Sequence, residues 1–145
     1  MPAWVQAGFH EYARRLPREC SLELKEVPLA RRSRGDSPAS LKKDEGRRLG
    51  AALPSGARLI ALEVGGKEWS TPELSGRLGA WLGDGRDVAL LVGGPDGLDR
   101  ELSESCDEQW SLSRLTLPHP LVRVIVAEQL YRAWSLLQGH PYHRS

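Results

Sequence analysis

Apolar runs alternate with amphipathic stretches along the chain, and this alternation predicts strands separated by helices. The runs at 58–64 and 87–92 are short and apolar, and each ends at a pair of glycines. A third strand is predicted at 110–117, where Pro118 closes it. Because successive strand–helix units form a parallel sheet covered by helices, the pattern predicts the α/β class.

Helical spacing of apolar side chains marks the segments between these runs. Amphipathic helices are expected at 1–16, about 41–53, 71–83 and 121–137. The third has a serine or threonine able to cap it and a proline in its first turn, which favour a helix start. The last is apolar over more than one face, so we expect it to be buried on several sides, partly in a subunit interface.

Two of the predicted strands differ in the exposure that their patterns indicate. Residues 21–27 alternate apolar and charged side chains, which predicts a half-exposed strand near an edge of the sheet. Residues 88–92 are apolar without alternation. A run of this kind is typical of a parallel strand covered on both faces, so a central position is expected for it.

Length and charge limit the partners of the protein. The 145 residues fit a single domain spanning 1–145, and the net charge of +1 excludes nucleic-acid binding by bulk charge. Any such contact needs a local patch, and residues 30–48 hold seven Lys or Arg against three Asp or Glu. Charge alone fits a solvated loop and helix as well as a basic arm that contacts phosphates.

Cysteine and apolar content indicate the cellular compartment. Cys20 and Cys106 lie far apart without a CxxC pair, so neither a zinc cluster nor a redox motif is expected, and no metal site. One disulfide is compatible with two cysteines, although two free thiols suit a cytosolic protein better. No apolar run approaches the ~20 residues of a membrane span, and no signal-peptide pattern is present. We therefore expect a cytoplasmic protein without a membrane partner.

Three motifs have chemical potential. Glycines in VGGPDG, after the predicted strand at 87–92, let backbone N–H groups approach a ligand, or simply form a tight turn. Their spacing fits neither a P-loop nor a dinucleotide motif. LTLPHP predicts a rigid loop in which His119 has no necessary role. The tail holds His140, Tyr142, His143 and Arg144, which suit base stacking and phosphate binding or form a frayed end.

In combination, these residues resemble the RlmH family of bacterial ribosomal RNA methyltransferases. The similarity rests on LLVGGPDGL and WSLSRLTLPHPLVRVIVAEQLYRAWSLLQGHPYHR, and it extends to MPAWVQAGFHEYARRLP and LIALEVGGKEWSTPELS, hence to the whole chain. The resemblance implies a parallel-sheet SPOUT methyltransferase fold with a C-terminal trefoil knot, a homodimer, and S-adenosylmethionine as methyl donor. It implies methylation of N3 of a pseudouridine in a 23S rRNA stem-loop on assembled ribosomes.

The resemblance also assigns residues by motif. The implied cofactor pocket comprises Leu62, Gly93, Leu112, Ser113, Arg114, Leu115, Thr116 and Leu117. Their backbone groups are expected to contact the adenine and the amino-acid end of the cofactor, and the leucines to enclose the ring. Implied RNA contacts are Arg123, Arg132 and the basic-loop residues Arg31, Arg32 and Arg34, although Arg132 fits a structural role equally well.

The partner subunit's tail is expected to supply the catalytic residues. The N3 proton of pseudouridine must leave, because a neutral imide nitrogen is a poor nucleophile. We expect His143 to accept the proton near neutral pH, and Arg144 to hold the developing anion or a phosphate. Tyr142 is expected to stack or to form a hydrogen bond.

One feature departs from the family pattern. Family members begin with a short apolar strand and a GK-type turn, whereas this chain starts at the following helix. We expect that strand to lie inside the sheet, so that 21–27 lacks a neighbouring strand. We expect a start codon assigned too late to be the reason that this strand is missing. Two other functions remain open: a related knotted methyltransferase acting on tRNA, and a ribosome- or RNA-binding module without turnover.

Overall fold

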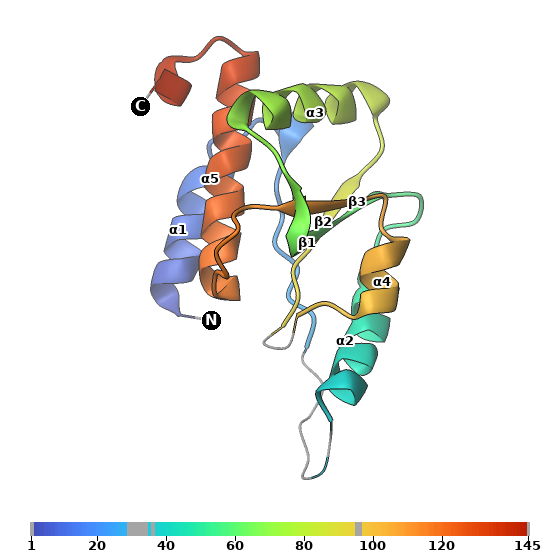
Figure 1. Ribbon diagram of the computed structural model, residues 1–145. Helices are drawn as coiled ribbons and strands as arrows, with labels where there is room; N and C mark the ends of the chain where they lie inside the picture. The colour runs from blue at the N-terminus through green and yellow to red at the C-terminus, as the bar shows by residue number, and fades with distance from the viewer. Residues whose placement is uncertain (1, 29–34, 36, 95–96, 145) are drawn as a thin grey trace. The chain divides into compact units, whose positions relative to one another are not determined.

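The computed structural model describes residues 2–28, 35, 37–94 and 97–144, which divide into two compact units (Figure 1). The helical unit comprises Met1–Leu24, Trp69–Gly85 and Pro120–Ser145, and the sheet unit comprises Lys25–Glu68 and Arg86–His119. The basic-loop residues Arg31, Arg32 and Arg34 lie outside the described residues.

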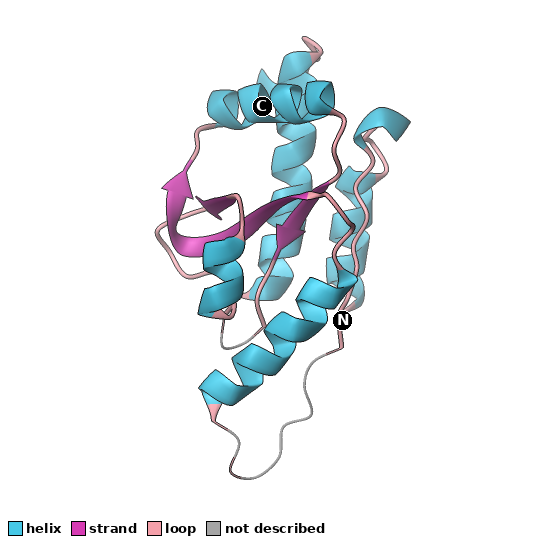
Figure 2. Ribbon diagram, turned by 90° about the vertical axis from the view of Figure 1, so that its right-hand side faces the viewer, coloured by secondary structure: helices cyan, strands magenta, loops and turns pink. Residues whose placement is uncertain are grey.

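A parallel sheet of three strands forms the centre of the sheet unit (Figure 2). The strands are β1 (Arg58–Glu68), β2 (Val88–Leu91) and β3 (Glu108–Ser111), in the order β2-β1-β3. Ala61 of β1 is in register with Leu91 of β2 and with Gln109 of β3. Because both pairs are parallel, all three carboxyl ends lie at one edge of the sheet. The predicted α/β class with a parallel sheet is confirmed.

Two helices pack against the sheet within this unit. Helix α2 (Pro38–Ala52) begins after Ser37, whose side chain accepts from the Ser40 N–H at 3.1 Å. Helix α4 (Arg100–Ser105) begins after Asp99, which caps it in the same way, and it falls in an acidic stretch that the sequence left unassigned. Leucines of both helices pack against a buried cluster on the sheet. The cluster consists of Ala61, Leu91, Leu98 and Cys106, and the residues packed against it are Leu49, Leu53, Leu59, Ala89 and Leu102.

The strand predictions need correction in three places. β2 lies at an edge of the described sheet and β1 at its centre, so the central position expected for 87–92 is wrong. An apolar run indicates that helices cover a strand, as α2 and α4 do here. It does not indicate that other strands pair with it on both sides. β3 is shorter than predicted, because 112–117 form a loop. Residues 21–27 belong to no strand: this segment pairs with no described strand, and Leu24 is 40% exposed.

β1 continues through the glycines that were expected to end it, and it bulges there. Leu62 and Lys67 both pair with Trp110, so residues 63–66 leave the regular ladder. A β-carbon on Gly66 would lie 2.8 Å from the Gln109 backbone, closer than real side chains approach. A glycine is therefore required where the bulge crosses β3.

The helical unit contains α1 (Ala3–Ala13), α3 (Thr71–Asp84) and the long helix α5, which begins at His119 and ends at Leu137. Short 3-10 turns η1 (Arg18–Cys20) and η2 (Pro141–Arg144) complete it. Ser70 and Glu73 form a reciprocal capping box at the start of α3. α1 and α5 lie side by side, since a β-carbon on Gly8 would meet Val124 at 3.3 Å (Figures 1 and 2).

Burial along α5 agrees with its apolar pattern. Six of its side chains are buried, namely Val126, Ala127, Leu130, Tyr131, Ala133 and Ser135. α3 contacts it through a buried hydrogen bond of 3.0 Å from the Ser75 hydroxyl to the Ala133 carbonyl. Both cysteines are free thiols, as the sequence favoured. No helix among the described residues is long and apolar enough to cross a membrane.

The Gly66 contact predicts a position-specific loss of stability. In Gly66→Ala the new methyl group must displace the β3 backbone, and we expect a loss of about 1–3 kcal/mol in the free energy of unfolding. Gly65→Ala is the matched control, because nothing lies within 4 Å of a β-carbon there. Urea denaturation of the three proteins measures the difference. Equal stability of the two variants would contradict the close packing of the bulge.

Candidate active site

The segments implied in cofactor binding meet at the carboxyl edge of the sheet. Leu62 follows Ala61, which is level with the last residue of β2, and Leu62 itself pairs with Trp110 of β3. Gly93 lies two residues beyond the end of β2, and Leu112 directly follows β3. Three segments that are far apart in sequence are therefore neighbours in the sheet unit.

The glycine turn after β2 requires its glycines for a steric reason. Gly97 has φ of 85° and donates from its N–H to the Gly94 carbonyl at 2.9 Å. A β-carbon on Gly93 would lie 2.5 Å from the backbone of both Gly97 and Leu98. The tight-turn interpretation of this motif is therefore confirmed.

Local hydrogen bonds shape the loop after β3. The buried Ser111 hydroxyl donates to the Ser113 carbonyl at 2.9 Å, and the Leu115 N–H donates to the Ser113 hydroxyl at 3.0 Å. This bonding turns the chain away from a strand. The Leu115 side chain is 72% exposed, so this loop presents an apolar side chain to solvent directly after β3.

A hollow of about 470 Å³ lies beside the bulge of β1 in the sheet unit. Its lining includes Glu63, Gly65, Gly66 and Gln109. Glu63 directly follows Leu62, but the described residues that line the hollow include none of the implied cofactor residues. No sequence pattern singles out Glu63 or Gln109, because the bulge that brings them together depends on the register with β3.

The tail packs on its own chain in the helical unit. Tyr142 lies in η2, and its hydroxyl donates to Glu128 Oε2 on α5 at 2.9 Å. Its ring meets the Tyr131 ring edge-on, with centroids 4.6 Å apart. The backbones of His143 and Arg144 continue η2, while the positions of their side chains fall outside the description.

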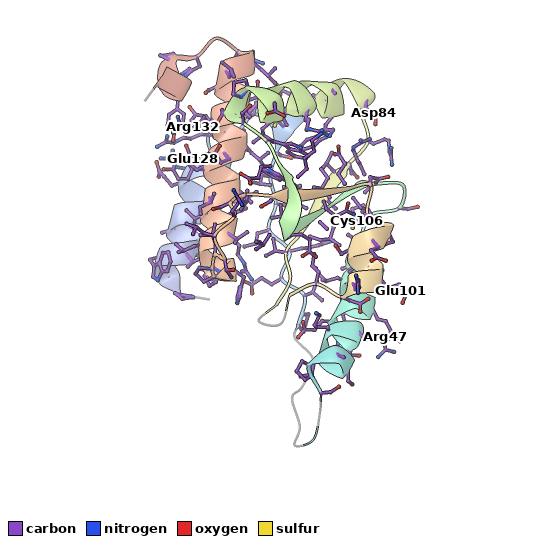
Figure 3. All side chains as sticks on the ribbon, viewed as in Figure 1. Arg47, Asp84, Glu101, Cys106, Glu128 and Arg132 are labelled. Carbon is purple, nitrogen blue, oxygen red and sulfur yellow. The ribbon has the colours of Figure 1, made fainter. Side chains whose placement is uncertain are left out.

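Two arginines surround Tyr142. Arg132 and Glu128 both project from α5 (Figure 3), and the Arg132 guanidinium binds Glu128 Oε2 at 2.9 Å and lies 5.1 Å from the Tyr142 ring centroid. The Arg15 guanidinium lies 5.9 Å from the same centroid. Glu128 and Arg15 were not selected from the sequence. The Glu–Arg spacing of four residues in one helix was the available signal for the ion pair.

Comparisons with known proteins identify the family of this chain. A family model described as "Predicted SPOUT methyltransferase" matches residues 1–143. The chain belongs to the SPOUT methyltransferase family. It is 58% identical over 144 residues to a protein of Methylococcus capsulatus and 57% identical over 144 residues to one of Hydrogenovibrio crunogenus. Both are named Ribosomal RNA large subunit methyltransferase H, and the matches cover 99% of this chain and 93% and 92% of those proteins.

SPOUT membership makes this protein a methyltransferase and implies the C-terminal knot predicted above. Knots are rare in proteins because threading a chain end opposes folding. The knot is therefore inferred from the family assignment, and the strand order alone does not imply it. Among the described residues, no group of three or more His, Cys, Asp or Glu is placed to hold a metal.

Two of the arginines that were expected to contact RNA, Arg132 and Arg123, lie on α5 of this SPOUT enzyme. Arg132 takes part in an ion pair with Glu128, in which the two side chains are 21% and 18% exposed, so the structural role is supported. Arg123 is half-buried on α5. An RNA contact by either residue stays a prediction, as does the role of Arg31, Arg32 and Arg34.

The protonation state of Tyr142 is set by its surroundings. Burial of the phenol raises the pKa of Tyr142 above its ordinary value of 10, and the hydrogen bond to the Glu128 carboxylate raises it further. The hydroxyl therefore remains a proton donor near neutral pH. Tyr142 is therefore not a base in this arrangement, and its expected role in the reaction stays a prediction.

This raised pKa predicts a pH-dependent contribution to stability. Below the ordinary pKa, wild type should be about 1 kcal/mol more stable than Tyr142→Phe, because the hydrogen bond to Glu128 is lost in the variant. Above that pKa the unfolded tyrosine ionises first, so the advantage falls as pH rises toward the folded-state pKa. Urea denaturation at about pH 8 and about pH 11 measures the difference between the two proteins. A difference that stays constant or grows would contradict the assignment.

Proposed function

We propose that this protein methylates N3 of a pseudouridine in a 23S rRNA stem-loop on assembled ribosomes, with S-adenosylmethionine as donor. The observation that carries the cofactor site is the meeting of Leu62, Gly93 and the 112–117 loop at one sheet edge. The substrate is supported by relatives that are 54–58% identical and named for ribosomal RNA of the large subunit.

The cofactor residues fit the proposed donor by their chemistry. Leu62, Gly93 and the loop Leu112, Ser113, Arg114, Leu115, Thr116 and Leu117 would hold it. The exposed Leu115 offers an apolar surface to an adenine ring, while the main chain around Gly93 offers polar groups to the ribose and amino-acid end. When bound, S-adenosylmethionine supplies an electrophilic methyl group on a sulfonium with a good leaving group. The protein mainly positions the reactants and excludes water.

The tail supplies the groups that handle the N3 proton. A pseudouridine imide is a weak nucleophile until it loses that proton, so a nearby acceptor accelerates transfer. His143 is the acceptor in this proposal, and Arg144 stabilises the anion that forms. Tyr142 stays protonated and fixes the tail through Glu128. The reaction needs no metal.

The assembly in this proposal is a homodimer with one 1–145 domain per subunit, in which the partner subunit's tail reaches the cofactor. Exposed apolar side chains on α1 and α5, including Trp4 at 57% and Leu121 at 39% exposure, are available to a second copy. Arg123, Arg132 and the basic loop supply contacts to rRNA phosphates. The reaction takes place in the bacterial cytoplasm, where ribosomes assemble.

Methyl transfer to ribosomes tests the proposal directly. Labelled S-adenosylmethionine and ribosomes from a strain lacking the modification should yield label in N3-methylpseudouridine of 23S rRNA. In Arg144→Ala and His143→Ala the turnover should fall by about tenfold or more, since each removes one group that assists proton loss. Mass spectrometry of nucleosides identifies the product.

The alternatives give different results in the same assay. Label in tRNA alone would identify the related tRNA enzyme, and tight donor binding without label in any RNA would indicate a binding module. Normal turnover of both tail variants would show that the tail does not take part in the chemistry.

Gly93 provides a separate test of the cofactor site. In Gly93→Ala the β-carbon clashes with the Gly97 and Leu98 backbone, so the turn must open and S-adenosylmethionine affinity should fall about tenfold, or ~1.4 kcal/mol. Gly50→Ala is the control, since its added β-carbon meets nothing within 4 Å. Isothermal titration calorimetry measures both. Unchanged affinity in Gly93→Ala would remove Gly93 from the cofactor site.

A further inference from the structure

Glu128 is the meeting point of the polar contacts between the tail and α5. Its Oε2 accepts from the Tyr142 hydroxyl at 2.9 Å and from Arg132 Nε at 3.0 Å, while its Oε1 accepts from Gln129 Nε2 at 2.7 Å. The side chain is only 18% exposed. The donors hold this buried carboxylate in one orientation, so a side chain that binds to it is held in a defined position as well.

The chain after α5 is directed back toward Glu128 by a defined helix end. Gly139 has φ of 70°, its N–H donates to the Leu136 carbonyl at 3.3 Å, and the His140 N–H donates to the Ser135 carbonyl at 2.8 Å. This bond pattern is a Schellman motif, which reverses the chain over the last turn of the helix. Tyr142 therefore returns along α5.

Ring contacts complete the binding of Tyr142. The Tyr131 ring lies edge-on at 4.6 Å, and the Arg132 and Arg15 guanidinium groups lie 5.1 and 5.9 Å from the Tyr142 centroid. Arg15 is itself paired with Glu11 on α1. The tyrosine is thus fixed at its hydroxyl and around its ring by residues of α5 and by Arg15, which follows α1.

We propose that Glu128 is a positioning residue that binds Tyr142 and thereby places the following His143 and Arg144 for methyl transfer. The inference rests on the proposed function, since the two residues matter only if the tail takes part in the reaction. Tyr142 directly precedes His143 and lies two residues before Arg144. Fixing the Tyr142 hydroxyl on α5 therefore limits the positions that both can reach.

Variants at Glu128 and Tyr142 separate positioning from other effects. Glu128→Ala removes the acceptor, whereas Glu128→Gln keeps an amide oxygen that can accept from the Tyr142 hydroxyl. We expect Glu128→Ala and Tyr142→Phe each to lower kcat about tenfold with unchanged S-adenosylmethionine affinity, and Glu128→Gln to retain kcat within about threefold. The double variant Glu128→Ala/Tyr142→Phe should be no slower than either single variant, because both break one contact.

Hydrogen–deuterium exchange supplies a readout that is independent of turnover. In Glu128→Ala, exchange should rise in residues 139–144 while the buried turns of α5 keep their protection, which separates release of the tail from unfolding. Glu104→Ala is the matched control: it also removes a carboxylate paired with an arginine four residues away, but on the solvent-exposed face of α4. We expect wild-type kcat and wild-type exchange of the tail in this control.

Two results would overturn the positioning role. One is wild-type kcat and tail protection in Glu128→Ala; the other is a double variant whose losses multiply, which would mean that the two residues act independently. If wild type itself fails to methylate rRNA, the proposed function fails, while the exchange data still decide whether Glu128 holds the tail.

Discussion

Parallel pairing of β1 with strands on both of its sides is the constraint on which the sheet unit depends. Each parallel pair aligns carboxyl ends, so the turn after β2 and the loop after β3 must emerge at the same edge beside Leu62. The bulge at 63–66 adds length to β1 without breaking this alignment, because Gly66 lets the strand lie against the β3 backbone. A candidate ligand site thus results from strand pairing, and its residues come from three distant parts of the chain.

The helical unit depends on a second type of interaction, charge inside a partly covered cluster. One carboxylate, Glu128, accepts from a tyrosine, an arginine and a glutamine. The arginine compensates the buried negative charge. The tyrosine hydroxyl donates to a remaining lone pair of the carboxylate, so the carboxylate has hydrogen-bond partners without full solvation. The same contacts keep Tyr142 protonated and hold the tail against α5. Stability of the tail and its proposed chemistry therefore have one physical origin.

Local sequence signals predicted most helices well. The start of α3 follows from its capping box and the position of Pro72, both of which act within one helical turn. Strand signals were less reliable. The apolar run at β2 predicted burial on both faces and a central position, but only Leu91 of its four residues is fully buried and the strand lies at an edge of the described sheet. The alternating residues 21–27 form no strand, because they pair with no described strand. Alternation describes a segment suited to a sheet, while hydrogen-bond partners decide whether it joins one.

The sequence by itself determined the α/β class, the positions of the helices other than α4, and the residues that carry the resemblance to a methyltransferase family, since periodicity, capping and motif identity are properties of neighbouring residues. Only the tertiary structure decided the strand order, the bulge at Gly66 and the binding of Tyr142 by Glu128. These features join residues that are distant in sequence, such as Gly66 with Gln109. Their energies depend on distances that exist only once the chain has folded, so no local pattern specifies them.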